Sequence, residues 1–283
     1  MIEIGIGNTC NSNCIMCTSL MPPPKHLKVL SKNDIFREID SHEPSNEYAI
    51  TGGEPTIRND LFEIIEYIKK KSPFAWIKIV TNGRMFAYPD YAKKFASYKN
   101  CSIISEFHGS NEEIHDKITE SKGSFLQTLK GIKNLMKLNV QISLRIVISK
   151  ENINDLSEIA KFYVNEFNDV HDVTLFPIDL VGNAQKNKEK LFISYTDLKQ
   201  PLEKALDVLS TGDFSLNVFH VPFCMIDKKY YKYIPKGLTV IEKRVEFIEY
   251  CRDCIYKDEC PRVWKTYIKY FGGHELKPIM KKD

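Results

Sequence analysis

The chain has 283 residues, of which 43% are hydrophobic and 27% are charged, as in ordinary globular proteins. Its 40 basic and 37 acidic residues leave a net charge of only +3, so no strong field favours nucleic acid or an anionic membrane surface. No apolar run reaches the length of a membrane span, and the first residues lack the basic and apolar regions of a secretory signal. We therefore expect a cytoplasmic protein.

Strand and helix patterns alternate through residues 1–190. Strands are predicted at residues 2–7, 48–51, 75–80, 102–107, 140–149 and 172–177. Helices are predicted between them at residues 31–41, 59–69, 89–98, 124–138 and 153–167. Six β/α units favour an α/β fold in which a parallel sheet curves into a partial, TIM-like (β/α)6 barrel. A full barrel has eight units, so we expect a lateral opening through which a peptide or another large substrate can enter.

Three cysteines follow the first predicted strand at a spacing that suits an iron–sulfur cluster. Cys10, Cys14 and Cys17 form the pattern C-x3-C-x2-C. Three thiolates can hold a [4Fe–4S] cluster while one iron stays open for a ligand. A zinc site would need a fourth ligand, and the nearest imidazole is that of His26. Eight cysteines without a secretory signal indicate a reducing compartment rather than a disulfide framework.

Two glycine-containing motifs follow the next two predicted strands. Gly52-Gly53-Glu54-Pro55 comes after the second strand, and Thr81-Asn82-Gly83 comes after the third. Loops at the carboxyl ends of parallel strands lie on one face of a barrel, so we expect these motifs to lie near the cysteines. Glycine lacks Cβ, which lets backbone groups approach a ligand closely, although a plain turn would use the same residues.

With these three motifs the chain resembles the radical S-adenosylmethionine (radical SAM) superfamily. The resemblance implies that the open iron binds the amino and carboxylate groups of S-adenosylmethionine. An electron from a reductant such as flavodoxin or ferredoxin then cleaves this co-substrate to methionine and a 5′-deoxyadenosyl radical. The cofactor-binding residues that the resemblance suggests are Met16, Gly52, Gly53, Glu54, Pro55, Asn82, Ser105, Glu106, Ser143 and Arg145.

The later strands supply the weaker candidates in this set. The segment from Ser105 to Gly109 is similar to the family's fourth strand, where a polar side chain contacts the ribose. His108 stands where members more often have Asp, so it is either a proton shuttle or a packed histidine. Ser143 and Arg145 alternate along strand five, and a guanidinium can bind the methionine carboxylate through two hydrogen bonds. The thioether of Met16 is expected to lie against the adenine.

Residues 191–283 are predicted to form a C-terminal Cys-rich domain that begins with a helix at 195–209. Cys251, Cys254 and Cys260 form C-x2-C-x5-C, which resembles the auxiliary-cluster extensions called SPASM and Twitch. The seven-cysteine SPASM pattern is incomplete, so one further [4Fe–4S] cluster with Cys224 as fourth ligand is expected. A structural zinc on the same thiolates is the rival interpretation. Cys224 is alternatively a hydrogen-atom donor, and Cys101 is assigned as a buried thiol.

Three functions remain open at this point. The first is a radical SAM oxidoreductase that matures a ribosomal peptide, by a cross-link or another oxidative change whose electron the auxiliary cluster accepts. The second is an epimerase or dehydrogenase acting on a sugar, an aminoglycoside or a nucleoside. The third is a non-catalytic interaction protein that carries zinc or a cluster. Many peptide maturases start with a leader-binding domain of about 80 residues. Because the first strand is predicted from Ile2, we expect no such domain here, which argues against the first function.

Overall fold

Alternating apolar and polar residues build a sheet of parallel strands in strict chain order. The computed structural model describes residues 1–19, 30–236 and 242–281, so His26 lies outside the described residues. The strands are β1 (Ile2–Gly5), β2 (Glu47–Thr51), β3 (Trp76–Val80), β4 (Cys101–Glu106), β5 (Gln141–Ile148), β6 (Asp172–Pro177) and β7 (Ser215–Val218). Each pairs in parallel with the next, which confirms the α/β fold and is consistent with a partial barrel.

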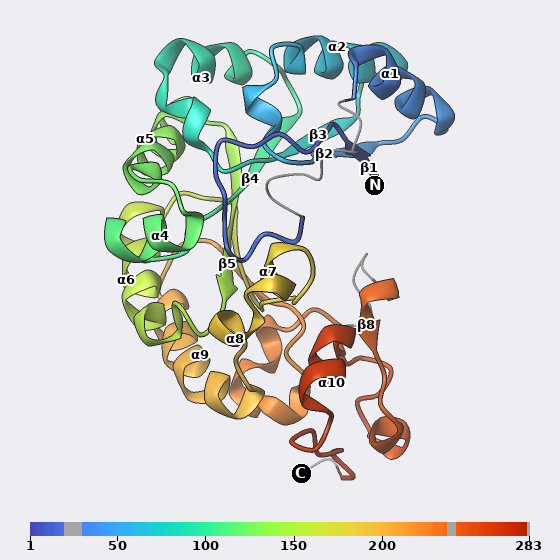
Figure 1. The fold of residues 1–283 in the computed structure, drawn as a ribbon, viewed down its shortest axis with the longest axis vertical. Helices are drawn as coiled ribbons and strands as arrows, with labels where there is room; N and C mark the ends of the chain where they lie inside the picture. Colours follow the sequence, from blue (N-terminus) through green and yellow to red (C-terminus); the bar gives the residue numbers. More distant parts are fainter. Residues whose placement is uncertain (20–29, 237–241, 282–283) are drawn as a thin grey trace.

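Helices cover the outer side of this sheet (Figure 1). They are α1 (Lys32–Ser41), α2 (Leu61–Lys71), α3 (Pro89–Ala96), α4 (Glu112–Thr119), α5 (Ser124–Lys137), α6 (Leu156–Glu166) and α9 (Tyr195–Leu209). The short α7 (Asn183–Lys186) and α8 (Lys188–Leu191) precede α9 and lie apart from this layer, next to residues 15–19. Ser31 caps α1 through a capping box with Asp34, as its position before the helix predicts. α4, a short helix capped by Asn111, was not predicted from the sequence.

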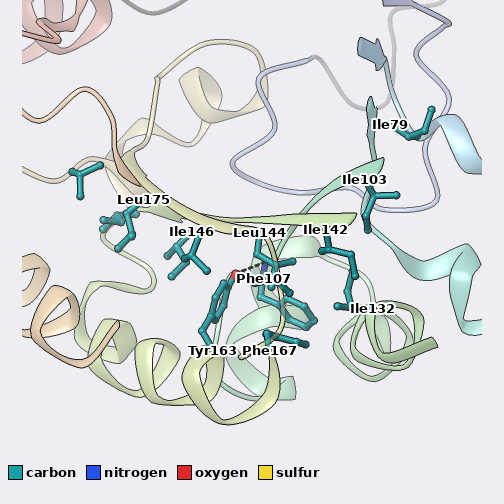
Figure 2. Packing of buried hydrophobic residues seen from close by; sticks show 14 of the residues in the cluster. Ile79, Ile103, Phe107, Ile132, Ile142, Leu144, Ile146, Tyr163, Phe167 and Leu175 are labelled. Carbon is teal, nitrogen blue, oxygen red and sulfur yellow. Dashed lines mark hydrogen bonds between the residues drawn. The ribbon is translucent and has the colours of Figure 1, made fainter. Parts of the chain in front are cut away.

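The two faces of the sheet differ because side chains alternate along every strand. Ile4, Ile50, Ile79, Ile103 and Ile142 lie side by side in register, and each is at most 1% exposed. Figure 2 shows this apolar face packed on the helix layer. Burying one such side chain stabilises the fold by roughly 1.5–3 kcal/mol, so this row holds the helices on the outer side.

The opposite, inner face carries polar side chains in the same register. Glu106 of β4 lies beside Arg145 of β5, followed by Thr174 of β6 and Asn217 of β7. Because the strands are parallel, all their carboxyl ends meet at one edge of the sheet. The inner face near that edge is therefore where polar ligands can be bound.

The sheet extends beyond residue 190, the expected boundary between the two domains. α9 and β7 add a seventh strand, with β7 paired to β6, so the barrel continues to about Val218. β7 has only four residues, two of which carry small polar side chains, so the alternation that predicts a strand is weak there.

Among the described residues, no helix is both long enough and apolar enough to cross a membrane.

The rest of the chain forms a tail of short elements. β8 (Val245–Glu246) and β9 (Val263–Trp264) pair antiparallel, and α10 (Lys265–Phe271) follows. The 3-10 helices of the chain are η1 (Pro55–Ile57), η2 (Arg84–Ala87), η3 (Ile153–Asp155), η4 (Phe223–Met225), η5 (Lys228–Tyr233), η6 (Glu242–Arg244) and η7 (Glu249–Asp253). Val245, Trp264 and Tyr267 belong to the same hydrophobic core as the barrel, so the tail packs against it directly.

Candidate functional site

The cysteine loop, which we define as residues 6–19, packs against the loop that follows β2. The backbone N–H of Gly53 donates to the carbonyl of Gly7 at 2.7 Å, and that of Glu54 donates to Thr9 at 2.8 Å. A Cβ on Gly53 would lie 2.1 Å from the carbonyl oxygen of Thr9. Gly52 has φ of +146°, and its Cβ would lie 2.4 Å from the carbonyl oxygen of Gly7. Both glycines are therefore needed for the two loops to touch.

Glu54 ties the loop after β2 to the loop after β3. Its buried carboxylate accepts hydrogen bonds from the Thr56 N–H at 2.9 Å, the Thr81 hydroxyl at 2.7 Å and the Asn82 N–H at 2.6 Å, and also from the Thr56 hydroxyl. Burial raises the pKa of Glu54, while these donors oppose that shift. Pro55 is buried at the start of η1. The carboxylate thus holds the two glycine motifs together.

Residues of the third motif bind the cysteine loop itself. The Asn82 side-chain amide donates to the side-chain oxygen of Asn11 at 2.7 Å. The Arg84 guanidinium donates to the carbonyl of Asn11 and, at 3.0 Å, to the hydroxyl of Ser12. Further along the loop, the backbone N–H of Ile15 donates to Ile118 of α4 at 2.9 Å. The segment from Cys10 to Ile15 is therefore fixed from two sides.

The three thiols of this loop are partly buried and close enough to influence one another. Burial raises the pKa of the Cys10 thiol to about 11 and also raises the pKa values of Cys14 and Cys17. The N–H groups of Ser12 and Ser19 point at the sulfurs of Cys10 and Cys17, each at 3.4 Å. At neutral pH the metal-free thiols hold their protons, which binding of an iron–sulfur cluster would displace.

The donor set of the loop fits a cluster. Three thiol donors on one loop match the ligand set of a [4Fe–4S] cluster with one open iron, and N–H groups aimed at ligand sulfurs help set such a cluster's potential. In the described part of the chain, no three His, Cys, Asp or Glu side chains lie close enough to surround a single metal ion.

Glu106 and Arg145 lie on the inner face below the cysteine loop. Arg145 Nη1 is 3.9 Å from Glu106 Oε1, and both side chains are about one third exposed. The charge of Glu106 contributes to the raised pKa values of Cys14 and Cys17, which places it near them. Ser143 precedes Arg145 by two residues on the same face of β5, and its hydroxyl donates a hydrogen bond to the carboxylate of Asp172. A pair of opposite charges therefore lies on the inner face near the thiols.

Ser105 lies on the opposite face of β4 from Glu106, because neighbouring residues of a strand alternate. Its hydroxyl is fully buried without a hydrogen-bond partner in the described chain, and it is 3.1 Å from where a Cβ on Gly83 would be. Ser105 thus faces the helix layer. Both residues were expected to bind the co-substrate because their segment is similar to the family's fourth strand, but alternation along β4 places their side chains on opposite faces.

His108 and Met16 are both buried close to the site. The Nδ1 atom of His108 has no partner among the described residues, and its backbone N–H donates to His115 Nδ1 at 3.2 Å. Burial lowers the pKa of His108, so its ring is neutral near pH 7. Met16 packs in a small apolar cluster with Val147 and Ile178.

The four tail cysteines, Cys224, Cys251, Cys254 and Cys260, line one cavity together with Phe223 and Tyr256. Burial, followed by the neighbouring thiols, raises the pKa of Cys224 to about 12. The cavity brings Cys224 to the three clustered cysteines although 26 intervening positions separate it from Cys251. The buried Cys101 lies apart from this set, at the start of β4.

Arg58 is a positioning residue that sequence reasoning missed. Its guanidinium donates to the carbonyls of Ile6 at 2.9 Å and Leu30 at 3.1 Å, one before and one after the three cysteines. Two further hydrogen bonds of 2.8 Å join it to Asp60. Apart from its position three residues after Pro55, no pattern in the sequence marks this role.

An open parallel α/β barrel with a three-thiol loop at the carboxyl edge of its sheet defines an enzyme class that uses an iron–sulfur cluster. The chain belongs to the Radical SAM superfamily, whose family model matches residues 4–163.

Relatives with similar sequences differ in activity. The chain is 26% identical over 212 residues to a probable GTP 3′,8-cyclase of Saccharolobus islandicus, covering 72% of this chain and 67% of the relative. It is 28% identical over 154 residues to the mycofactocin maturase MftC of Mycolicibacterium smegmatis, covering 53% of this chain and 38% of the relative.

The crystal structure of Streptococcus suis SuiB has the same fold. It superposes with a TM-score of 0.60 at 15% identity, covering 88% of this chain. The chain spans about half of SuiB, 54% of its length. SuiB has also been solved with S-adenosylmethionine and with its precursor peptide SuiA.

Proposed function

We propose that this enzyme reductively cleaves S-adenosylmethionine and abstracts a hydrogen atom from a carbon of a ribosomal peptide, leading to a cross-link or another oxidative change. The observation that carries the proposal is the convergence of three thiols with Glu106 and Arg145 at the carboxyl edge of the sheet. Membership of the Radical SAM superfamily supports the chemistry, and the peptide-modifying relatives support the substrate class.

Each residue of the site has a distinct role in this proposal. Cys10, Cys14 and Cys17 hold a [4Fe–4S] cluster, which, when bound with S-adenosylmethionine, supplies the 5′-deoxyadenosyl radical. Arg145 binds the methionine carboxylate and Glu106 the ribose hydroxyls, since a guanidinium and a carboxylate are complementary to these groups. The surrounding barrel holds the reacting C–H bond close and excludes water.

Glu54 and the two glycines contribute indirectly. Because the carboxylate of Glu54 is already occupied by its own loops, these residues act by fixing the backbone that meets the co-substrate. Asn82 likewise anchors Asn11 of the cysteine loop. A reductant such as flavodoxin or ferredoxin supplies the electron.

The tail supplies the second part of the proposal. The four thiols of its cavity are the ligands of an auxiliary [4Fe–4S] cluster that accepts the electron left after substrate oxidation. A structural zinc on the same thiols is the alternative. It would have to draw together thiols that do not surround a single ion in the described chain, and it would leave the radical chemistry unchanged. Reconstituted protein is expected to contain about eight irons with two clusters, and about four with zinc in the tail.

A small-molecule substrate is the second candidate, and one comparison favours it. The GTP 3′,8-cyclase relatives cover more of this chain than the peptide maturase does. A nucleoside, sugar or aminoglycoside would then occupy the inner face, with an epimerisation or a dehydrogenation as the outcome. His108 or Cys224 would be the residue to examine as a proton shuttle or hydrogen-atom donor.

Two cysteine variants test the assignment of the clusters. Replacing Cys10, Cys14 and Cys17 by Ala is expected to abolish formation of 5′-deoxyadenosine with dithionite. Replacing Cys251, Cys254 and Cys260 by Ala is expected to leave cleavage that is uncoupled from substrate turnover. Continued 5′-deoxyadenosine formation by the first variant would refute the proposed co-substrate site.

Deuterium transfer tests the hydrogen abstraction and separates the substrate classes. Two kinds of candidate substrate would be tested in parallel, each deuterated at carbon: GTP, and the short peptides that are encoded next to this enzyme's gene. We expect deuterium in 5′-deoxyadenosine with the true substrate only. A product formed without such transfer would rule out direct abstraction. A product that differs from the labelled substrate only by hydrogen in place of that deuterium would favour epimerisation.

A further inference from the structure

The tail docks on the residues that directly follow β6. The indole N–H of Trp264 donates to the carbonyl of Pro177 at 2.8 Å. The hydroxyl of Thr266 donates to Asp179 at 2.6 Å and accepts from the N–H of Leu180 at 3.3 Å. Arg244 forms an ion pair with Asp179, which is only 4% exposed. Side chains from η6, β9 and α10 thus all bind one short stretch of the barrel.

The next residues of the same stretch hold the cysteine loop. The N–H of Ala184 donates to Cys17 at 3.1 Å, and the N–H of Asn183 donates to Ser19 at 3.0 Å. The side-chain amide of Asn187 donates to the carbonyl of Ile15 at 3.2 Å, and that of Asn183 lies 3.4 Å from the carbonyl of Cys14. These donors satisfy loop carbonyls that would otherwise be exposed or unpaired.

The close approach of the two segments is built into the backbone. Gly182 has φ of +60°, and a Cβ there would lie 2.4 Å from the carbonyl oxygen of Thr18. Tyr270 of α10 packs against the apolar cluster that contains Ile15 and Met16, and its hydroxyl accepts from Gln185 of α7 at 2.9 Å. Figure 1 shows α7 between the end of the cysteine loop and the tail.

We propose that residues 177–187 form a brace through which the docked tail positions Cys14 and Cys17, with Asp179, Thr266 and Asn187 as positioning residues. Asp179 and Thr266 fix the brace to the tail, and Asn187 fixes the cysteine loop to the brace. The proposal rests on the assignment of Cys14 and Cys17 as cluster ligands. It gives the tail a role at the first cysteine site that does not depend on electron transfer or on the substrate.

The first test uses metal-free protein and measures how fast iodoacetamide alkylates each cysteine, resolved by peptide mass spectrometry. Asp179→Asn, Thr266→Val and Asn187→Ala are each expected to speed alkylation of Cys14 and Cys17 by about fivefold, equivalent to one lost hydrogen bond of about 1 kcal/mol. Thr266→Ser keeps the hydroxyl and is expected to restore the wild-type rates.

Two controls separate positioning from general destabilisation. Lys236→Ala removes an exposed ion pair with Glu259 within the tail and should leave the rates unchanged. The buried thiol of Cys101 in β4 reports on unfolding of the barrel, and its rate should not change in any variant. Acceleration of Cys101 together with Cys14 and Cys17 would overturn the proposal, because global opening would explain it.

The second test uses reconstituted protein and measures the electron paramagnetic resonance signal of the reduced cluster at Cys10, Cys14 and Cys17. Addition of S-adenosylmethionine is expected to shift this signal less completely in Thr266→Val than in the wild type or Thr266→Ser. If Asp179→Asn and Thr266→Val both keep wild-type alkylation rates and wild-type signals, the brace is refuted. If reconstituted wild-type protein shows no cluster signal, the proposed function is refuted instead, and the alkylation test still decides the brace.

Discussion

Glu54 illustrates how a residue of a functional motif can act through its neighbours. Within the described chain, the hydrogen bonds that it accepts come from Thr56, Thr81 and Asn82, in or beside the motifs themselves. A buried carboxylate is costly unless donors compensate it, and here backbone and hydroxyl donors do so. The residue therefore converts two separate loops into one rigid support for the cysteine loop.

Glu54→Gln is expected to lower the free energy of unfolding by about 2 kcal/mol. A glutamine can point its oxygen at only one group of donors, which leaves its NH2 facing the Asn82 N–H or the threonine hydroxyls. Urea denaturation of metal-free protein measures the change. Glu3→Gln is the control, because Glu3 is exposed and, among the residues that the structure describes, accepts a hydrogen bond from the Thr51 hydroxyl alone, at 2.9 Å. Equal losses in the two variants would contradict the role given to Glu54.

His220 is expected to make the fold sensitive to acid. Its ring is buried against Trp264, at 3.7 Å between centroids, and burial, with Arg244 nearby, lowers its pKa to about 4. In the unfolded chain a histidine has a pKa of about 6.5. Between about pH 4 and pH 6.5 the unfolded chain therefore binds a proton at His220 and the folded chain does not. The free energy of unfolding is therefore highest above about pH 6.5, and it falls by roughly 3 kcal/mol as the pH is lowered toward 4.

His220→Asn tests this pH dependence. His220 has φ of +57°, a conformation that asparagine tolerates, so the variant keeps the backbone while removing the titrating ring. Unfolding free energies measured from pH 4 to 8 should show a shallower slope in the variant below pH 6.5. Parallel curves for the two proteins would exclude His220 as the source of the slope.

At the scale of elements, the loops after β1 and β2 depend on one another. Gly53→Ala is expected to destabilise the fold by about 3 kcal/mol and to reduce iron bound at the first site, because the new Cβ would overlap the carbonyl of Thr9. Gly5→Ala is the matched control in the neighbouring strand, since a Cβ there meets nothing within 4 Å. Retention of wild-type iron content in Gly53→Ala would show that the loops can separate without harm.

The sequence predicted those parts of the structure that leave a local pattern. Strands such as β3 and β5 have a clear alternation of apolar and polar residues. The three motif loops were predicted to lie together because the carboxyl ends of parallel strands share one edge of the sheet. β7 and α4 were missed because short elements carry few periodic residues.

Contacts between distant segments left no such pattern. Asn187 binds the cysteine loop across 172 positions, and no spacing in the sequence indicates this. Ser105 was grouped with Glu106 because their segment is similar to the family's fourth strand, whereas the alternation of β4 sends their side chains to opposite faces. The site is thus predictable where a motif encodes it and unpredictable where tertiary packing does.

At the scale of the whole molecule, barrel and tail share one hydrophobic core, which runs from Ile4 to Leu276. The tail's own elements are short, β8 and β9 having two residues each, so they bury little apolar surface without the barrel. Stability of the tail must then come mainly from docking on residues 177–180 and from the common core. We therefore expect the two parts of the metal-free protein to unfold together.

The chain's two tryptophans allow this to be measured directly, because each reports on one part. Trp76 lies in β3 and donates to Ser102 at 2.8 Å, whereas Trp264 lies in β9 of the tail. In Trp76→Phe the remaining fluorescence follows the tail, and in Trp264→Phe it follows the barrel. Within each variant, the urea midpoint from fluorescence is expected to equal that from far-ultraviolet circular dichroism. Trp264→Phe should also lose about 1 kcal/mol, because it leaves the carbonyl of Pro177 without its donor. A tail signal that changes at lower urea than the circular dichroism would mean that the tail unfolds separately, and the shared core would then be too weak to couple the two parts.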